Sequence, residues 1–255
     1  MRNKRSLLLI CLLFFATFLL VTELRNSFAM IDLQINSWAI SIQTGSLTAT
    51  AIVIAYLFNT TSMAAISLAI AVYLFYRNYK EYGVLLLAAM GGDALIVWLT
   101  KTLIHSPRPS NGILYEAGYS FPSGHTTTSI VFCSLLTYFV WQHWNSPKAK
   151  TASSTLSIAT ISIVAFDRIY LNVHWFSDVV GGLLLGIFWL TLMLWIFKYA
   201  KSRGDSRIQL PERRLHSLAK KGKKGNKKSA NSSPNASDVP LERSLDSCWS
   251  LQHRG

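Results

Sequence analysis

The stretch YGVLLLAAMGGDALIVWLTKTLI, from Tyr82 to Ile104, is apolar over the length of about 20 residues that a helix needs to cross a bilayer. Asp93 interrupts it and must face protein or water, because a charge in lipid is expensive. Similar apolar stretches recur from the start of the chain to about Ala200. Of the 255 residues, 51% are hydrophobic, and the mean hydropathy of +0.30 is high for a soluble protein. The sequence therefore predicts an integral membrane protein.

The predicted fold is all-α, a bundle of six transmembrane helices. The six predicted crossings are Ser6–Val21, Thr60–Tyr76, Tyr82–Ile104, His125–Trp141, Thr151–Phe166 and Asp178–Tyr199. The first follows a basic start and precedes no close small-x-small cleavage site, so we interpret residues 1–29 as a membrane anchor rather than a signal peptide. Residues 25–45 are expected to lie near the membrane surface. Residues 47–58 form either a helical lead-in to the second crossing or a separate membrane segment.

The distribution of Lys and Arg predicts the orientation, because positively charged loops stay cytoplasmic. With the amino terminus inside, the outside segments contain only four basic residues, namely Arg25, Lys101, Arg108 and Arg168. Both termini are therefore expected in the cytoplasm of a multi-pass protein of the cell membrane. The cations outside need a separate explanation.

The composition changes abruptly at residue 201, where Lys, Ser, Asn, Gly and Pro replace the apolar residues. The tail, residues 201–255, has 13 basic and 5 acidic side chains and so contributes +8 to the net charge of +13. This composition predicts disorder. A polybasic segment directly after a membrane helix is well placed to bind anionic lipid at the membrane surface. We expect no nucleic-acid partner. A solvated tail that only enforces topology is the alternative. The predicted core is residues 30–200.

The first polar cluster is KTLIHSPRP, from Lys101 to Pro109. Lys101 ends a predicted crossing, where a lysine often extends its ammonium to the interface. The two prolines stiffen the loop that carries Arg108. A helix end and a stiff loop could also direct both cations at one anion.

The second cluster is FPSGH, before the fourth crossing. Free N–H groups of a first helical turn can bind an oxyanion, Gly124 allows a close approach, and Ser123 adds a hydroxyl. The alternative is an ordinary serine cap. His125 is a candidate general acid beside such a site.

The third cluster is DRIYLNVHWFSDVVGG, from Asp167 to Gly182. His174 and Asp178 are four residues apart, which suits one face of a turn, and a carboxylate on one imidazole nitrogen makes the other more nucleophilic. The alternative is an interfacial histidine and an aspartate at a helix start. Gly182 and Gly186 in this region suit close helix packing, either within the bundle or between subunits.

All three clusters are predicted on the outer face of the membrane. Together they supply three cations, two imidazoles and a carboxylate, without the spacing of a metal site. This inventory is typical of a site where fixed positive charges hold a phosphate and a nucleophile attacks it.

The order K-x6-RP (Lys101 to Pro109), PSGH (Pro122 to His125) and R-x5-H-x3-D (Arg168 to Asp178) resembles the type 2 phosphatidic acid phosphatase superfamily. This superfamily includes lipid phosphate phosphatases and vanadium haloperoxidases. The resemblance covers roughly residues 30–200. The third motif departs from the usual pattern, because Asp167 stands where the family has Ser and partly offsets the charge of Arg168. Six apolar crossings are not expected in the haloperoxidase branch.

The resemblance implies a role for each residue. His174 would attack phosphorus and form a phosphohistidine, Asp178 would orient it, and His125 would protonate the leaving oxygen and then activate water. The residues implied in phosphate binding are Lys101, Arg108, Ser123, Gly124 and Arg168. No metal and no cofactor are expected.

We therefore expect a metal-independent phosphatase of a lipid phosphate or diphosphate. A polyprenyl diphosphate is slightly preferred over a phosphatidate-type lipid. The alternatives are a catalytically silent protein that binds or moves lipid phosphates, and a lipid phosphotransferase. The sequence leaves the oligomeric state open.

Overall fold

The computed structural model describes the backbone of residues 2–229 and the side chains of residues 5–203. Within this range every regular element is helical, which confirms the all-α prediction. The elements are α1 (Arg2–Glu23), η1 (Leu24–Phe28), α2 (Ala29–Ser41), α3 (Gly45–Leu57), α4 (Thr60–Tyr76), α5 (Lys80–Ile104), α6 (Gly124–His143), α7 (Pro147–Tyr170) and α8 (Phe176–Ser229).

Four described segments are long and apolar enough to cross a membrane, or five if the bent pair α3 and α4 counts as one span. The four segments are Arg5–Ser41, Lys80–Ile104, Pro147–Tyr170 and Phe176–Arg203. The prediction of six crossings is thus confirmed only in part. The predicted crossing Thr60–Tyr76 qualifies only together with α3, as the bent pair. The predicted crossing that does not qualify at all is α6, whose first turns carry three threonines and a serine, Thr126–Ser129. Most of these side chains are buried against neighbouring helices, so protein rather than lipid surrounds them.

Residues 45–57 form a separate helix, α3, rather than a continuous lead-in to α4. The two axes differ by 53°. The break has a local cause, because the Asn59 side chain accepts a hydrogen bond of 2.7 Å from the Ser62 N–H and caps α4. The polar run Asn59–Ser62 therefore marks a helix start.

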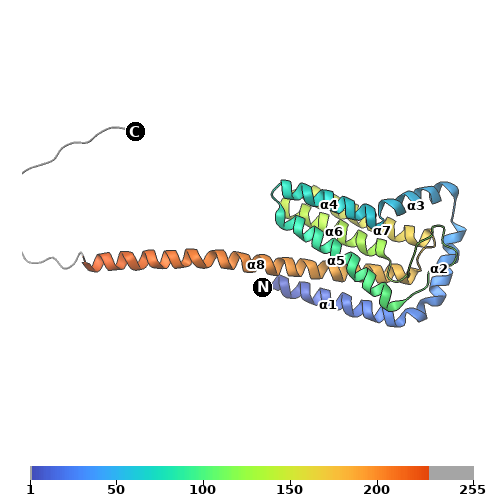
Figure 1. Cartoon of the computed structure of the whole chain (residues 1–255), viewed down its shortest axis with the longest axis horizontal. Coiled ribbons are helices and arrows are strands. Elements are labelled where there is room, and N and C mark those ends of the chain that lie inside the picture. Colours follow the sequence, from blue (N-terminus) through green and yellow to red (C-terminus); the bar gives the residue numbers. More distant parts are fainter. Residues whose placement is uncertain (1, 230–255) are drawn as a thin grey trace, which may run out of the picture. The chain divides into compact units, whose positions relative to one another are not determined.

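The centre of the bundle is α6, which packs against α5 and α7, while α4 lies along α5 (Figure 1). Asp93 of α5 is only 1% exposed and accepts a hydrogen bond of 2.6 Å from Thr128 of α6. The charge inside the predicted crossing thus faces protein, as expected.

Two glycines bring α8 close to α6. A Cβ added at Gly182 would lie 2.7 Å from the backbone oxygen of Ser123, and one at Gly186 would lie 3.1 Å from Ile130 Cβ. Such distances leave no room for a side chain at Gly182. This glycine pair therefore packs within the bundle, which decides between the two alternatives that the sequence left open.

The expected disorder from residue 201 is not confirmed, because α8 continues to Ser229. A helix that is already nucleated can extend at low cost into a sequence that would not start one. Residues 230–255, the rest of the predicted tail, lie outside the described residues. The chain divides into a unit of residues 1–202 and a second unit that begins at Arg203.

Candidate functional site

The candidate site forms where five chain segments meet: the end of α5, the loop from residue 105 to 123, the start of α6, the end of α7, and the turn into α8. The three polar clusters of the sequence lie on these segments. The structure brings most of the predicted residues together around His174, which is 3% exposed.

The His174 imidazole faces Asp178 through its Nδ1 atom. Nδ1 lies 3.4 Å from Asp178 Oδ2 and 3.3 Å from the Ser120 hydroxyl oxygen. Ser120 also donates a hydrogen bond to Asp178 Oδ2, and the Trp175 N–H donates to the same oxygen at 2.8 Å. These donors fix the carboxylate beside the ring, so Asp178 can orient His174.

The other ring nitrogen, Nε2, lies 3.3 Å from a guanidinium nitrogen of Arg108. A guanidinium can only donate hydrogen bonds, and a carboxylate can only accept them. Both neighbours therefore favour the tautomer with hydrogen on Nδ1 and a lone pair on Nε2. Burial first, and then the positive charges of Arg108 and Lys101, hold the pKa of His174 well below 6.5. The lowered pKa favours the neutral imidazole, which is the form that could act as a nucleophile.

Arg108 is fixed from several sides. Its guanidinium donates to the backbone oxygens of Val173 at 2.8 Å and of Gly118 at 3.1 Å. Gly118 has a φ of 80°, which favours glycine at this turn of the loop. Burial lowers the pKa of Arg108, and Glu116 opposes that shift. The arginine thus ties the loop after α5 to the backbone beside His174.

Lys101 is directed at the same loop. Its ammonium donates hydrogen bonds to the backbone oxygens of Tyr119 and Ser120, the second at 3.2 Å. The lysine is therefore turned toward the site, not to the membrane interface.

Arg168 has a side chain with 0% exposure. Its Nε and one terminal nitrogen donate to Asp167 Oδ2, and its other terminal nitrogen lies 2.9 Å from Glu116 Oε1. The sequence suggested that Asp167 partly offsets the positive charge of Arg168. In the structure the two side chains form a direct ion pair. It leaves one guanidinium edge directed toward Glu116.

Ser123 precedes α6 but is not an ordinary cap, since its side chain makes no capping hydrogen bond. It is fully buried, and its N–H donates to the Asp178 backbone oxygen at 3.0 Å. The first helical hydrogen bond runs from the Thr127 N–H to the Ser123 oxygen. The N–H groups of residues 124–126 precede that bond, so they are available for an anion.

His125 is placed differently from the other predicted residues. It lies in the first turn of α6, near the backbone of Ala55 in α3. It is also close enough to Arg168, Arg108 and Lys101 for their charges to act on its ring.

Sequence reasoning missed three residues of this region: Asp32, Glu116 and Ser120. The Asp32 carboxylate in α2 accepts from the Ser177 N–H at 2.8 Å and from its hydroxyl at 2.7 Å, which holds the start of α8. Neither Asp32 nor Glu116 lies in a recognisable motif. Ser120 directly precedes FPSGH, and a small polar side chain at the edge of that cluster was the available signal.

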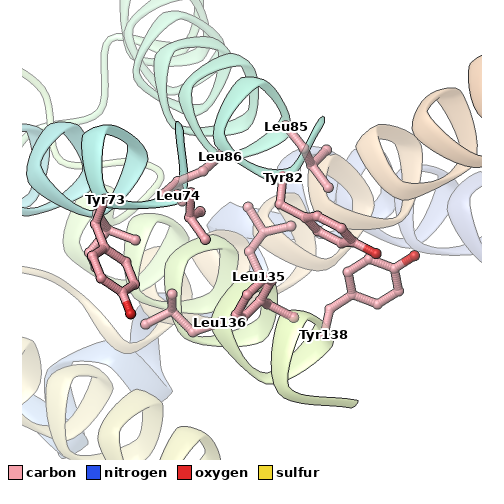
Figure 2. Close-up of a pocket in the computed structure, with 10 residues that line it drawn as sticks. Tyr73, Leu74, Tyr82, Leu85, Leu86, Leu135, Leu136 and Tyr138 are labelled. Carbon is pink, nitrogen blue, oxygen red and sulfur yellow. The ribbon is translucent and has the colours of Figure 1, made fainter. Parts of the chain in front are cut away.

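A separate apolar pocket of about 240 Å³ lies at the other end of α5. Figure 2 shows its wall, which includes Tyr73, Tyr82 and Tyr138 from α4, α5 and α6. None of the predicted site residues lines it. The candidate site is therefore the polar cluster and not this pocket.

Comparison with known proteins adds a family match. Residues 82–202 match the PAP2 superfamily. Phosphatidylglycerophosphatase B of Bacillus subtilis (strain 168) is 32% identical over 116 residues, which are 44% of this chain and 56% of that protein. Lipid A 4'-phosphatase of Porphyromonas gingivalis is 27% identical over 159 residues, 54% of this chain and 61% of that protein. The matches thus span between half and two thirds of these relatives.

The structure is also similar to the crystal structure of a transmembrane PAP2 type phosphatidylglycerolphosphate phosphatase from Bacillus subtilis. The TM-score is 0.69 at 26% identity, over 74% of this chain and 96% of that one. Together with the apolar helices, this similarity identifies an integral membrane protein.

Proposed function

Because residues 82–202 of this chain form a PAP2 superfamily domain, we propose that the protein is a membrane-integral phosphatase of lipid phosphates. The observation that carries the proposal is the environment of His174. One ring nitrogen faces a carboxylate, and the other faces a guanidinium in a cluster of fixed cations. A lipid-binding protein without catalysis would have no need for an oriented, neutral imidazole at that point.

We assign the nucleophile to Nε2 of His174. Its lone pair attacks phosphorus, a P–N bond forms, and the bond from phosphorus to the lipid oxygen breaks. The positive charge that develops on the ring is stabilised by Asp178 next to Nδ1. His125 protonates the leaving oxygen, then takes a proton from the water that cleaves the phosphohistidine. This step requires the His125 ring to face the leaving oxygen.

The phosphoryl oxygens would be held by Lys101, Arg108 and Arg168 and by the first turn of α6, with Ser123 and Gly124. Phosphoryl transfer depends mainly on positioning and on electrostatic stabilisation of the equatorial oxygens. Three cations fixed by the protein supply the charge that Mg²⁺ supplies in kinases. We therefore propose that the reaction is metal-independent.

An apolar groove supports a lipid substrate. It has a volume of about 350 Å³ and is lined mainly by apolar side chains of α3 and α7, including Leu47, Ile54 and Phe166. Asp167, the ion-pair partner of Arg168, lines the same groove. A lipid chain in this groove would bring its head group level with the guanidinium of Arg168.

The substrate carries a terminal phosphate or diphosphate on a lipid. The name and structure of the relatives make phosphatidylglycerophosphate the first substrate to test, beside phosphatidate and a polyprenyl diphosphate. From the sequence alone, a polyprenyl diphosphate was slightly favoured as the substrate.

We further propose six crossings, with the site on the outer face and both termini in the cytoplasm. The helix α6 has 20 residues, about 30 Å at 1.5 Å per residue, which is enough to span the hydrocarbon core. The basic residues after α8's apolar part would lie on anionic lipid.

The test uses purified protein in detergent with a chelator present. Phosphate release is measured from the three lipids, for the wild type and for His174→Ala. We expect release from at least one lipid by the wild type and none by the variant. No release from any lipid, or equal release by the variant, would contradict the proposal. Transfer of phosphate to an added alcohol would indicate a phosphotransferase.

A further inference from the structure

A carboxylate lies between the two arginines of the proposed phosphate site. Glu116 Oε2 is 2.9 Å from Arg108 and Glu116 Oε1 is 2.9 Å from Arg168, so one carboxylate bridges both guanidinium groups. Oε2 is also 3.7 Å from His174 Nε2. This is the position, beside the nucleophile and between the cations, that the phosphoryl group of a substrate would take.

The two arginines need an anion when no phosphate is bound. The Arg168 side chain is 0% exposed and that of Arg108 is 16% exposed. Leaving a buried cation without a counter-charge strongly destabilises a protein. Asp167 neutralises only the Nε side of Arg168, and its other edge and Arg108 share the Glu116 carboxylate.

Glu116 is also able to leave. It lies in the irregular segment between α5 and α6, its side chain is 20% exposed, and the neighbouring Tyr115 is 95% exposed. Its carboxylate can therefore move toward solvent without disturbing the packed helices. The fixed cations, in contrast, are held by backbone and carboxylate contacts that do not involve Glu116.

We propose that Glu116 is the resting counter-ion of the phosphoryl site, and that a phosphate binds by exchange with it. The inference rests on the proposed function, because it takes the phosphate of a substrate or product as the incoming anion. By linkage, the carboxylate stabilises the phosphate-free protein and weakens phosphate binding to the same extent. If Glu116 occupies the site about 90% of the time, phosphate binds about tenfold more weakly than to the open site.

The test compares Glu116→Gln with the wild type. Glutamine keeps the size and removes the charge, so it competes poorly with phosphate for the guanidinium groups. Glu23→Gln is the matched control, because it removes one carboxylate at the exposed end of α1 and touches none of the site residues named here. Binding of inorganic phosphate is measured by calorimetry in detergent, and the thermal midpoint is measured with and without phosphate.

For Glu116→Gln we expect an about tenfold lower phosphate dissociation constant, a lower midpoint without phosphate, and a larger rise on adding it. Glu23→Gln should match the wild type in its phosphate dissociation constant, in its midpoint without phosphate and in the rise of the midpoint on adding phosphate. Equal phosphate affinity in Glu116→Gln and wild type would overturn the proposal. So would a Glu116→Gln protein that fails to fold even in saturating phosphate, because phosphate could not then replace the carboxylate.

The result is separable from the proposed function. If the wild type releases phosphate from lipids but Glu116→Gln binds phosphate no more tightly, the counter-ion proposal alone fails. If the variant binds phosphate more tightly but no lipid is hydrolysed, the anion exchange holds and the phosphatase proposal fails.

Discussion

Arg108 directs a guanidinium nitrogen at Nε2 of His174, at a distance of 3.3 Å. Because a guanidinium has no lone pair to offer, Nε2 must accept, and its lone pair points at the cations proposed to hold the phosphate. One contact thus aligns the proposed nucleophile with the proposed phosphate site.

Asp178→Asn should reduce kcat/KM by at least about 10²-fold. The amide can donate to Nδ1 and so favours the tautomer with hydrogen on Nε2, which cannot attack phosphorus. Initial rates of phosphate release from the preferred lipid measure the effect. An unchanged thermal midpoint would show that the fold is intact, and a loss of only a few-fold would contradict the assigned role of Asp178.

His174 should remain neutral at pH 6.5. Burial and the neighbouring cations lower its pKa, so protonation, and with it the loss of the nucleophile, occurs only further into the acid range. A histidine with a lowered folded-state pKa contributes stability above its unfolded pKa, and this contribution is lost as the pH falls. NMR of protein with ¹⁵N-labelled histidine, assigned with His174→Ala, measures the titration directly. A midpoint at or above pH 6.5 would refute the prediction.

Gly124→Ala should lower kcat/KM by about 10–100-fold while the protein still folds. A Cβ at this position would lie 3.5 Å from Val97, an ordinary contact, so the packing tolerates it. The methyl group would, however, stand at the start of α6 where the phosphate is proposed to approach the backbone. Lipid hydrolysis and thermal unfolding are measured together. Full activity would remove Gly124 from the proposed phosphate site.

Gly182→Ala should destabilise the protein by about 1–3 kcal/mol. The new Cβ would lie 2.7 Å from the Ser123 backbone oxygen and push α8 away from α6. Gly91→Ala is the matched control, since a Cβ there meets nothing within 4 Å. Unfolding in detergent should separate the two variants. Equal stability of Gly182→Ala and Gly91→Ala would contradict the close packing of α8 against α6.

The sequence predicted the helical class and the convergence of the three polar clusters, because both depend on local patterns. Long apolar stretches require helices in a membrane, and the three motifs place their polar residues at helix ends. The pairing of His174 with Asp178 followed from a spacing of four at a helix start. Residues with such fixed spacing can be recognised without a structure.

Glu116 and Asp32 could not be predicted, because their partners are far away in the chain. Glu116 meets Arg168 across 52 positions, and Asp32 meets Ser177 across 145. The number of crossings was also uncertain from hydropathy, since α6 buries its threonines within the bundle. The disorder expected from composition alone was not confirmed, because α8 continues to Ser229.

The most direct test of the central claim is to trap the phosphohistidine. Lipid substrate labelled with ³²P in its terminal phosphate is mixed with wild type, His125→Ala and His174→Ala, and each reaction is quenched in base, where phosphohistidine survives. We predict covalent label on the wild type and none on His174→Ala. On His125→Ala the label should form more slowly and also decay more slowly, because this variant lacks the acid of the first step and the base of the second. Lipid hydrolysis without label on the wild type or on His125→Ala, or label that persists in His174→Ala, would contradict the account.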